Sequence, residues 1–430
     1  MTRRSSHASR RDGDTIMVSL LVLLIVLGCA AFQYLKGTLV RAFATFIVTI
    51  CASVVAFSYF ELLAGLFIGG RDSTFKFLPA PWMQTLSFLL LFLFTFAVLQ
   101  TLAQYLTRQE VDLGLWPERI GRVVFGILSG LVLSSFLITA SAMAPLPSKY
   151  PYQRFDQRYP DADRPNKVLF NTDGLAAGLF GTVSKGSLSG KRSFATLHPA
   201  FLDQLFLNRH NIAENVPLIT SGQAIEVPTK NAVWPVPEGI KDSGGNPISP
   251  KSGHNLMFVR VGIRKSAVEE AGTFTLSQLR LICKKESELK NPLAEKGQNV
   301  YPIGYLTAAD MLQIKRLNEV IRVAHSDFED KAREKWIDFA FYVPAGSVPV
   351  LLEFKQNCIT QVPRPVTVEQ APPPVFFVPS SAGQKDTAKP EDTSKTPRSK
   401  RPTKPKTGSD GLPLSPITRP LVAPPLEDFR

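Results

Sequence analysis

Four long stretches without a charged side chain constrain this sequence more than any other feature. They cover residues 15–34, 42–60, 82–106 and 123–144. About 20 apolar residues in a helix, each rising 1.5 Å, cross the ~30 Å hydrocarbon core of a bilayer. The run FLLLFLFTF at 88–96 has no polar face that a helix exposed to water would need. The sequence therefore predicts a four-helix transmembrane domain over residues 15–147, preceded by a basic N-terminal tail over residues 1–14.

Two cations stand in the short connection between the first two apolar stretches. Lys36 and Arg41 have long side chains that can extend to lipid headgroups, so the two spans should form a tight hairpin with both residues at the membrane interface. Lys and Arg are more numerous on the side of the N-terminus than on the other side, which predicts cytoplasmic N- and C-termini. A signal peptide ending in a lipidated Cys29 is the alternative interpretation.

The fourth span carries a row of small residues that favours close helix packing. Gly126 and Gly130 form a GxxxG pattern, Ser134 extends it by one turn, and Gly121 precedes it. Small side chains let helix backbones approach closely in lipid, where apolar burial does not drive association. These four residues are predicted to pack against a neighbouring span or a second copy of the chain. The alternative is that glycine is simply frequent in such helices.

Acidic and basic residues open the same helix. Glu118 complements the positive end of the helix dipole, and Arg119 follows it at the expected membrane interface. Asp14 opens the first span, the basic connection follows, and Glu118, Arg119 and Gly121 lead into the GxxxG pattern. The helix then closes in the sequence Pro-Leu-Pro at 145–147.

In this order and spacing, residues 14–147 resemble the CvpA-like (colicin V production) membrane proteins. The resemblance implies a non-enzymatic, multi-pass protein of the bacterial inner membrane, involved in toxin production or secretion or in envelope homeostasis. Its expected partners are the lipid bilayer and a protein partner or second copy bound through the transmembrane helices. It implies no catalytic residue, no cofactor and no metal.

The remaining residues divide into three regions. Residues 148–250 are predicted to be a polar linker with short helices, of which one at 179–190 is amphipathic and ends in a turn near the membrane surface. Residues 251–360 are predicted to form a soluble, mostly β domain of sandwich type. Residues 361–430 are rich in Pro, Lys, Ser and Thr and are predicted to be a disordered tail, because they contain few core-forming side chains.

Strand patterns support the sandwich prediction. β-branched and aromatic residues alternate or cluster at 255–264, 274–283, 336–343 and 349–354. The run FAFYVPAGSVPVLLEFK over 339–355 resembles the last hairpin of immunoglobulin-like modules. Apolar residues at helical spacing over 311–323 predict a helix that interrupts the sheet, and Ser326 with Glu329 predicts the cap of another short helix.

Composition argues against several functional classes. The net charge of +13 is spread along the chain, so the concentrated basic face of a nucleic-acid-binding protein is missing. The five histidines are scattered without metal-ligand spacing, and His198 and His210 are interpreted as loop residues. Cys283 and Cys358 are expected to be buried free thiols, with a disulfide as the alternative. A transporter or channel is the alternative function, although the four spans, bounded as above, contain no ionisable residue.

Overall fold

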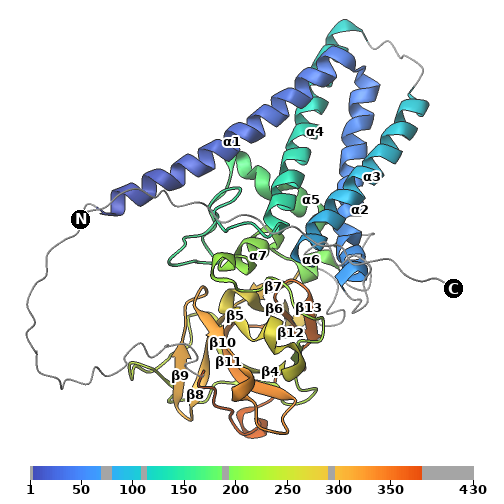
Figure 1. The fold of residues 1–430 in the computed structure, drawn as a ribbon. Coiled ribbons are helices and arrows are strands. Elements are labelled where there is room, and N and C mark those ends of the chain that lie inside the picture. Colours follow the sequence, from blue (N-terminus) through green and yellow to red (C-terminus); the bar gives the residue numbers. More distant parts are fainter. Residues whose placement is uncertain (1–2, 69–79, 108–113, 186–192, 289–295, 380–430) are drawn as a thin grey trace, which may run out of the picture. The chain divides into compact units, whose positions relative to one another are not determined.

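The computed structural model describes residues 3–68, 80–107, 114–185, 193–288 and 296–379 (Figure 1). Residues Met1–Ala382 form one compact unit. Several features used in the predictions lie outside the described residues. They are three cations of the loops between spans that count toward the predicted orientation (Arg71, Lys76 and Arg108), the turn at 186–190, and the tail from residue 380 onward.

The four apolar stretches form four long helices, as predicted. They are α1 (Arg3–Lys36), α2 (Leu39–Ile68), α3 (Met83–Leu106, preceded by the 3-10 turn η1, Ala80–Trp82) and α4 (Leu115–Met143). Each is long and apolar enough to cross a membrane. Helix α1 packs on α4, and α2 packs on both α3 and α4 (Figure 1). Helix α1 begins at Arg3, so most of the basic tail continues the first helix.

The second helix is longer than predicted. Its apolar stretch resumes after Glu61 with Leu62, Leu63 and Ala64, and α2 ends only at Ile68. The segment suited to a membrane span is Leu39–Phe67 and contains Glu61. The expectation that no span holds an ionisable residue is therefore wrong, because one carboxylate does not end a helix whose neighbours on both sides are apolar.

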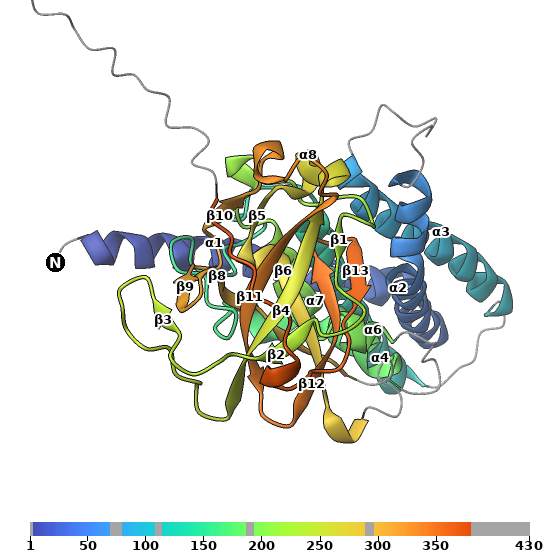
Figure 2. The ribbon, with the colours of Figure 1, turned by 90° about the horizontal axis from the view of Figure 1, so that it is seen from below.

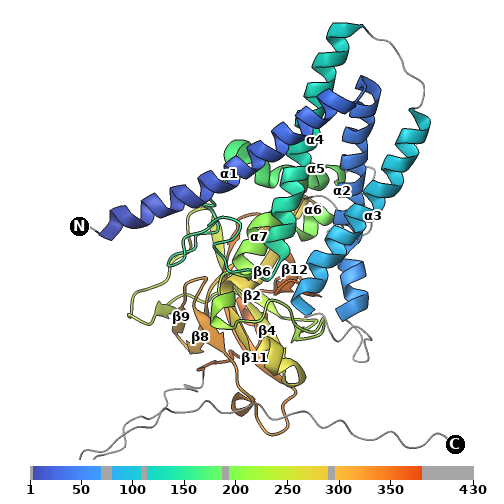
Figure 3. The same cartoon turned by 45° about the horizontal axis from the view of Figure 1, so that its top comes forward.

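Short helices connect the bundle to the rest of the chain. They are η2 (Leu169–Gly174), α5 (Leu175–Val183), α6 (Phe194–Leu197), α7 (Phe201–Asn208) and η3 (Ile212–Glu214). Helix α5 crosses α4 (Figures 1 and 3), and the backbone N–H of Ala176 donates to Ser135 Oγ of α4 at 2.7 Å. The rings of Phe57 on α2 and Phe180 on α5 stack at 5.4 Å. These helices therefore pack directly on the transmembrane bundle.

The region is mostly β, as predicted, and among the described residues it contains a large sheet, a small sheet and a two-stranded sheet. The large sheet has the order β1 (Ile225–Glu226), β4 (His254–Arg264), β11 (Glu334–Pro344), β8 (Pro302–Ala308), β9 (Met311–Ile314), β3 (Lys241–Asp242), with β2 (Val233–Pro235) also on β4. The small sheet has the order β13 (Cys358–Gln361), β12 (Ser347–Phe354), β6 (Leu279–Lys285), β7 (Gln298–Val300). Strands β4 and β11 are antiparallel neighbours over their whole length (Figure 2).

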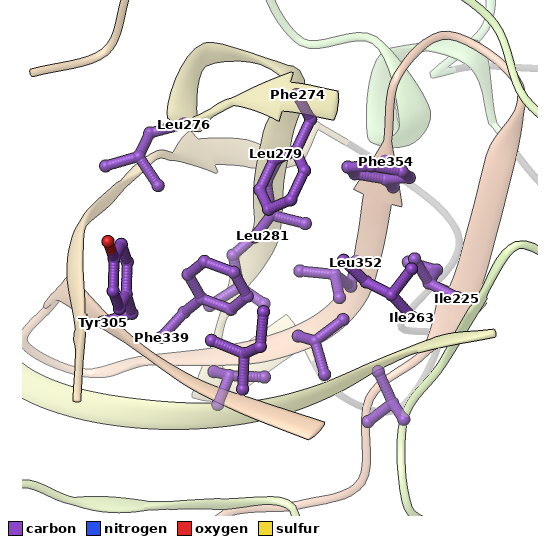
Figure 4. Close-up of a cluster of buried hydrophobic side chains, with 14 of the residues drawn as sticks. Ile225, Ile263, Phe274, Leu276, Leu279, Leu281, Tyr305, Phe339, Leu352 and Phe354 are labelled. Carbon is purple, nitrogen blue, oxygen red and sulfur yellow. The ribbon is translucent and has the colours of Figure 1, made fainter. Parts of the chain in front are cut away.

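Apolar side chains from the two sheets share one core. Figure 4 shows Phe339 of β11 and Ile263 of β4 near Leu281 of β6 and Leu352 of β12. A two-stranded sheet of β5 (Thr273–Thr275) and β10 (Val320–Arg322) adjoins them, with α8 (Val268–Ala271) and the 3-10 turns η4 (Lys265–Ala267), η5 (Leu276–Gln278), η6 (Glu286–Glu288) and η7 (His325–Asp327) in the connections. Cys283 and Cys358 are both buried and free.

Four details of the predicted β region are wrong. Residues 311–323 form β9 and β10 instead of a helix, because Leu312 and Ile321 are buried while Met311 and Ile314 are exposed. Ser326 lies within η7, where Asp327, and not Ser326, accepts the capping N–H of Ala324 at 2.8 Å. The 274–283 stretch is divided by η5.

The fourth prediction that is wrong is the hairpin expected at 339–355. Strands β11 and β12 are joined by a turn with Gly346 at φ 72°, but they belong to different sheets. Strand β11 pairs with β4 and β8, whereas β12 pairs with β6 and β13. The turn therefore carries the chain from one sheet to the other.

The start of the predicted tail is packed on the large sheet. Residues 361–379, which include η8 (Val368–Gln370), are described, and Phe377 is fully buried with its ring 5.4 Å from that of Tyr305. The Val375 N–H donates to Asp338 Oδ2 at 2.9 Å. Proline lowers the number of backbone donors in this stretch, and the N–H groups of Val366 and Phe377 also donate to the sheet, to the carbonyls of Val233 and Leu306.

Candidate functional site at the junction of helices and sheets

The predicted glycine face of α4 lies against α1. A Cβ atom on Gly126 would be 2.7 Å from Ala30 Cα, and one on Gly130 would be 2.7 Å from Val26 Cα. The buried Ser134 Oγ donates to the carbonyl of Gly130 at 2.7 Å. At the start of the helix, a Cβ atom on Gly121 would meet the side chain of Leu39 on α2. In this structure Gly121, Gly126 and Gly130 therefore pack against other helices of the same chain.

The four predicted interface residues lie at helix ends. Lys36 is the last residue of α1, and Arg41 stands exposed in the first turn of α2. Glu118, in the first turn of α4, forms an ion pair with Arg122, one turn further along the helix. Arg119 is exposed. Because Gly121 packs near Leu39, these helix ends gather at one end of the bundle.

A chain of four charged side chains, which the sequence did not indicate, lies at the opposite end. Glu61 Oε1 on α2 is 2.8 Å from His198 Nε2, just after α6. The other ring nitrogen of His198 is 3.0 Å from Gln204 Oε1 on α7. Because both ring nitrogens face oxygen acceptors, the protonated imidazole satisfies the arrangement with two N–H groups.

Arg280 continues this chain into the small sheet. Its Nη2 lies 3.4 Å from His198 Nδ1, donates to the Leu197 carbonyl at 2.7 Å and forms an ion pair with Glu353 on β12. The side chains of His198, Arg280 and Glu353 are only 4%, 4% and 5% exposed, whereas Glu61 is 40% exposed. We call Glu61, His198, Arg280 and Glu353 the junction cluster. It links a membrane helix to the β region.

Burial and charge compete at the junction cluster. Burial lowers the pKa of His198, but the Glu61 and Glu353 carboxylates together outweigh it, so the pKa lies above its ordinary value. Burial raises the pKa of Glu353, and the Arg280 guanidinium offsets this only in part. A buried ion pair is costly to break, because the remaining charge has no partner.

A small polar cavity adjoins the cluster. Its volume is about 20 Å³, which is room for one water molecule. It is bordered by buried atoms that have no hydrogen-bond partner among the described residues: Gln204 Nε2, Asn208 Oδ1, Gln278 Oε1, Tyr301 OH and Gln356 Nε2. The cavity is too small for an organic substrate. The hydrogen bonds and ion pairs of the junction cluster instead connect α2 to the small sheet.

A second buried contact fixes the end of α4. Arg209, which follows α7 and is fully buried, donates to the carbonyls of Ser141 at 2.9 Å and Ala144 at 3.3 Å. Its guanidinium lies 4.3 Å from the ring centre of Phe206. The last carbonyls of a helix have no partner within the helix, and a cation there also complements the helix dipole. Arg209 therefore attaches the connecting helices to α4.

Comparison with known families gives the identity of the helical part. Residues 18–156 match the family described as Colicin V production protein. The helical segment is thus similar to the CvpA-type proteins, and its four helices are long and apolar enough to cross a membrane. No curated protein and no solved structure matched the chain. The matched segment covers about a third of the sequence and contains Glu61, whereas His198, Arg280 and Glu353 lie outside it.

The junction cluster left a faint trace in the sequence. Glu61 is one carboxylate inside an apolar stretch that resumes immediately, which is the pattern of a functional residue within a membrane helix. Arg280 and Glu353 each interrupt the apolar residues of a predicted strand. His198, interpreted as a loop residue, does follow a helix but is buried. Within the described ranges, no group of three or more His, Cys, Asp or Glu side chains suits a metal ion.

Proposed function

We propose that this protein resides in the bacterial inner membrane, where its CvpA-type helices carry and orient a non-enzymatic, cytoplasmic protein-binding module. Its role would be toxin production or secretion, or envelope homeostasis. The family match supports the membrane role, and the junction cluster supports the orienting role. Because Glu61 on α2 is hydrogen-bonded to a histidine that contacts Arg280 of the small sheet, the module is fixed to the helices instead of hanging on a flexible linker.

A groove on the β region is the surface that we assign to a protein partner. Its volume is about 800 Å³, and it runs beside β7, the edge strand of the small sheet. Apolar residues such as Ile303, Leu317 and Tyr342 line it, with charges of both signs on Asp161 and Lys251. An extended peptide that adds to an exposed strand edge uses this combination of backbone pairing and side-chain pockets.

Complementation tests the role of the module. A bacterial strain that lacks its own CvpA-type protein and carries a colicin V-type toxin operon would receive the full chain, residues 1–147 alone, or Tyr342→Asp in the groove. We expect the full chain to restore toxin release, measured as the zone of killing, and the other two to fail despite equal membrane levels. Lys230→Gln, an exposed change away from the groove, is the matched control. Full activity of residues 1–147 would exclude the module from the function.

The side of the membrane needs a separate experiment. Cys358 is 1% exposed, so its labelling reports unfolding and not topology. Lys331 is exposed on the β region, and a cysteine placed there can be labelled with an impermeant maleimide. We expect labelling above the wild-type level only after cell lysis. Labelling in intact cells would place the module outside the cytoplasm.

One observation favours the alternative function, a transporter or channel. Glu61 lies within the segment of α2 that suits a membrane span, and ion-coupled transporters place ionisable residues inside their spans. Proton or ion flux into proteoliposomes that contain the full chain would distinguish the two functions. A flux that disappears in Glu61→Gln would favour transport over the orienting role.

A further inference from the structure

Helix α5 has two apolar faces, of which the described residues cover only one. Ala176 and Phe180 point inward, where Phe180 stacks on Phe57 of α2. Leu175 and Leu179, on the other side, are 41% and 36% exposed. Because α5 crosses the membrane helix α4 (Figures 1 and 3), it lies across the direction of the spans. A short apolar helix in this orientation fits the boundary between hydrocarbon and headgroups.

A groove runs along α5. Its volume is about 520 Å³, within the usual range for small-molecule sites. Gly178 and Gly181 form part of its floor, and a Cβ atom added to either would meet no atom within 4 Å. Three exposed lysines line it, and they come from three separate places in the chain: Lys167, Lys185 and Lys296. The fold thus gathers cations around an open space beside an apolar helix.

Among the described residues, the charge of this groove is positive. Arg154 lies at its base, but its guanidinium is already paired with Asp173 and Asp203. Asp203 is the one carboxylate among the described residues that line the groove. Within those residues, none of the three lysines forms an ion pair with an acidic side chain. An anionic ligand would therefore meet lysine side chains whose charge is still available.

We propose that this groove binds the phosphate headgroup of an anionic phospholipid. The three lysines would hold the phosphate, and the acyl chains would lie along the exposed face of Leu175 and Leu179. The continuity of the cationic groove with this apolar face favours a lipid over a soluble phosphate ester. The site goes beyond the proposed function, since it does not depend on which protein the β module binds.

Native mass spectrometry of the full-length protein in detergent tests the site. The protein would be titrated with phosphatidylglycerol and, separately, with phosphatidylcholine of the same acyl chains. We expect wild-type protein to retain phosphatidylglycerol preferentially. Three lysines near a membrane surface contribute enough that their loss should weaken this binding roughly 10- to 100-fold. The variant is Lys167→Gln/Lys185→Gln/Lys296→Gln.

Matched controls distinguish lipid binding at this groove from a general effect of the protein's net charge. Lys230→Gln/Lys241→Gln/Lys331→Gln removes the same charge from exposed positions of the β region and should bind like wild type. Gly178→Trp fills the groove without changing charge and should lose the lipid while keeping the thermal midpoint of unfolding. Equal losses in both lysine triples, or no loss in the groove triple, would overturn the proposal. Binding of glycerol 3-phosphate as tight as that of the lipid would overturn the assignment to a lipid.

Discussion

Replacing Arg280 by Met tests whether the junction cluster holds the β region together. The change removes one partner of a buried ion pair and leaves Glu353, whose side chain is 5% exposed, without its cation. Removing one member of such a pair costs about 3–5 kcal/mol. Arg280 also donates at 2.7 Å to both the Leu197 carbonyl and Asn299 Oδ1, and these acceptors lose a donor as well.

The double variant Arg280→Met/Glu353→Met separates these contributions. It still leaves the two acceptors without Arg280, which costs about 1–3 kcal/mol, but it no longer buries a lone carboxylate. The double variant should therefore be more stable than the single variant by roughly 2 kcal/mol, equivalent to about 4–8 °C in the midpoint of thermal unfolding.

Tryptophan fluorescence of the full chain in detergent provides the measurement. Trp234 and Trp336 lie on the large sheet, so with Trp82 and Trp116 of the helical bundle replaced by Phe in all three proteins the emission reports the unfolding of the β region. The three proteins would be melted at pH 7 under the same conditions. A double variant that melts at or below the temperature of the single variant would refute the reasoning, because it would show that the buried charge of Glu353 is not the source of the loss.

Three further predictions concern other parts of the structure. Gly126→Leu should cost roughly 1–3 kcal/mol in detergent unfolding of the bundle, because even a Cβ would be 2.7 Å from the α1 backbone, whereas Gly28→Leu, with no atom within 4 Å, should not. Glu61→Gln removes the carboxylate that raises the pKa of His198. Because the pKa of His198 is raised in the folded protein, its protonated form stabilises the fold below pH ~6.5, and this stability is lost as pH rises through the pKa of the folded state. The loss should be smaller in Glu61→Gln when the midpoint of thermal unfolding is measured across pH. Burial lowers the pKa of Lys355 from 10.5 to about 7. Between these two pH values the unfolded chain binds more protons than the folded protein, so stability should increase as pH rises from about 7 to 10.5. Lys355→Met should flatten this increase in the same assay.

The helices could be predicted because their signal is local. Each span is visible as an uninterrupted apolar stretch of sufficient length, and its place in the chain needs no knowledge of the partners. The error at the end of α2 has the same origin. One carboxylate looks like a boundary when only length is considered, but Glu61 is accommodated by a histidine 137 residues away in the sequence.

The β region shows the limits of periodicity. Met311 and Ile314 contributed to the helical pattern, yet they are 38% and 45% exposed, while Leu312 is fully buried. Strands this short contain too few residues for alternation to be distinguished from helical spacing. The packed start of the tail escaped prediction for a related reason. Phe377 stands in the short run Val-Phe-Phe-Val at 375–378 within a proline-rich stretch, and only the sheet beneath it explains its burial.

The turn at Gly346 has a consequence for biosynthesis. Since the segments before and after it complete different sheets, β4 gains its long neighbour β11 only when residues up to Pro344 have left the ribosome, and β6 gains β12 only when residues up to Phe354 have done so. The membrane helices emerge some two hundred residues earlier. The nascent protein thus has its membrane helices long before its sandwich can close, and in that interval its unpaired, apolar strands are prone to aggregation.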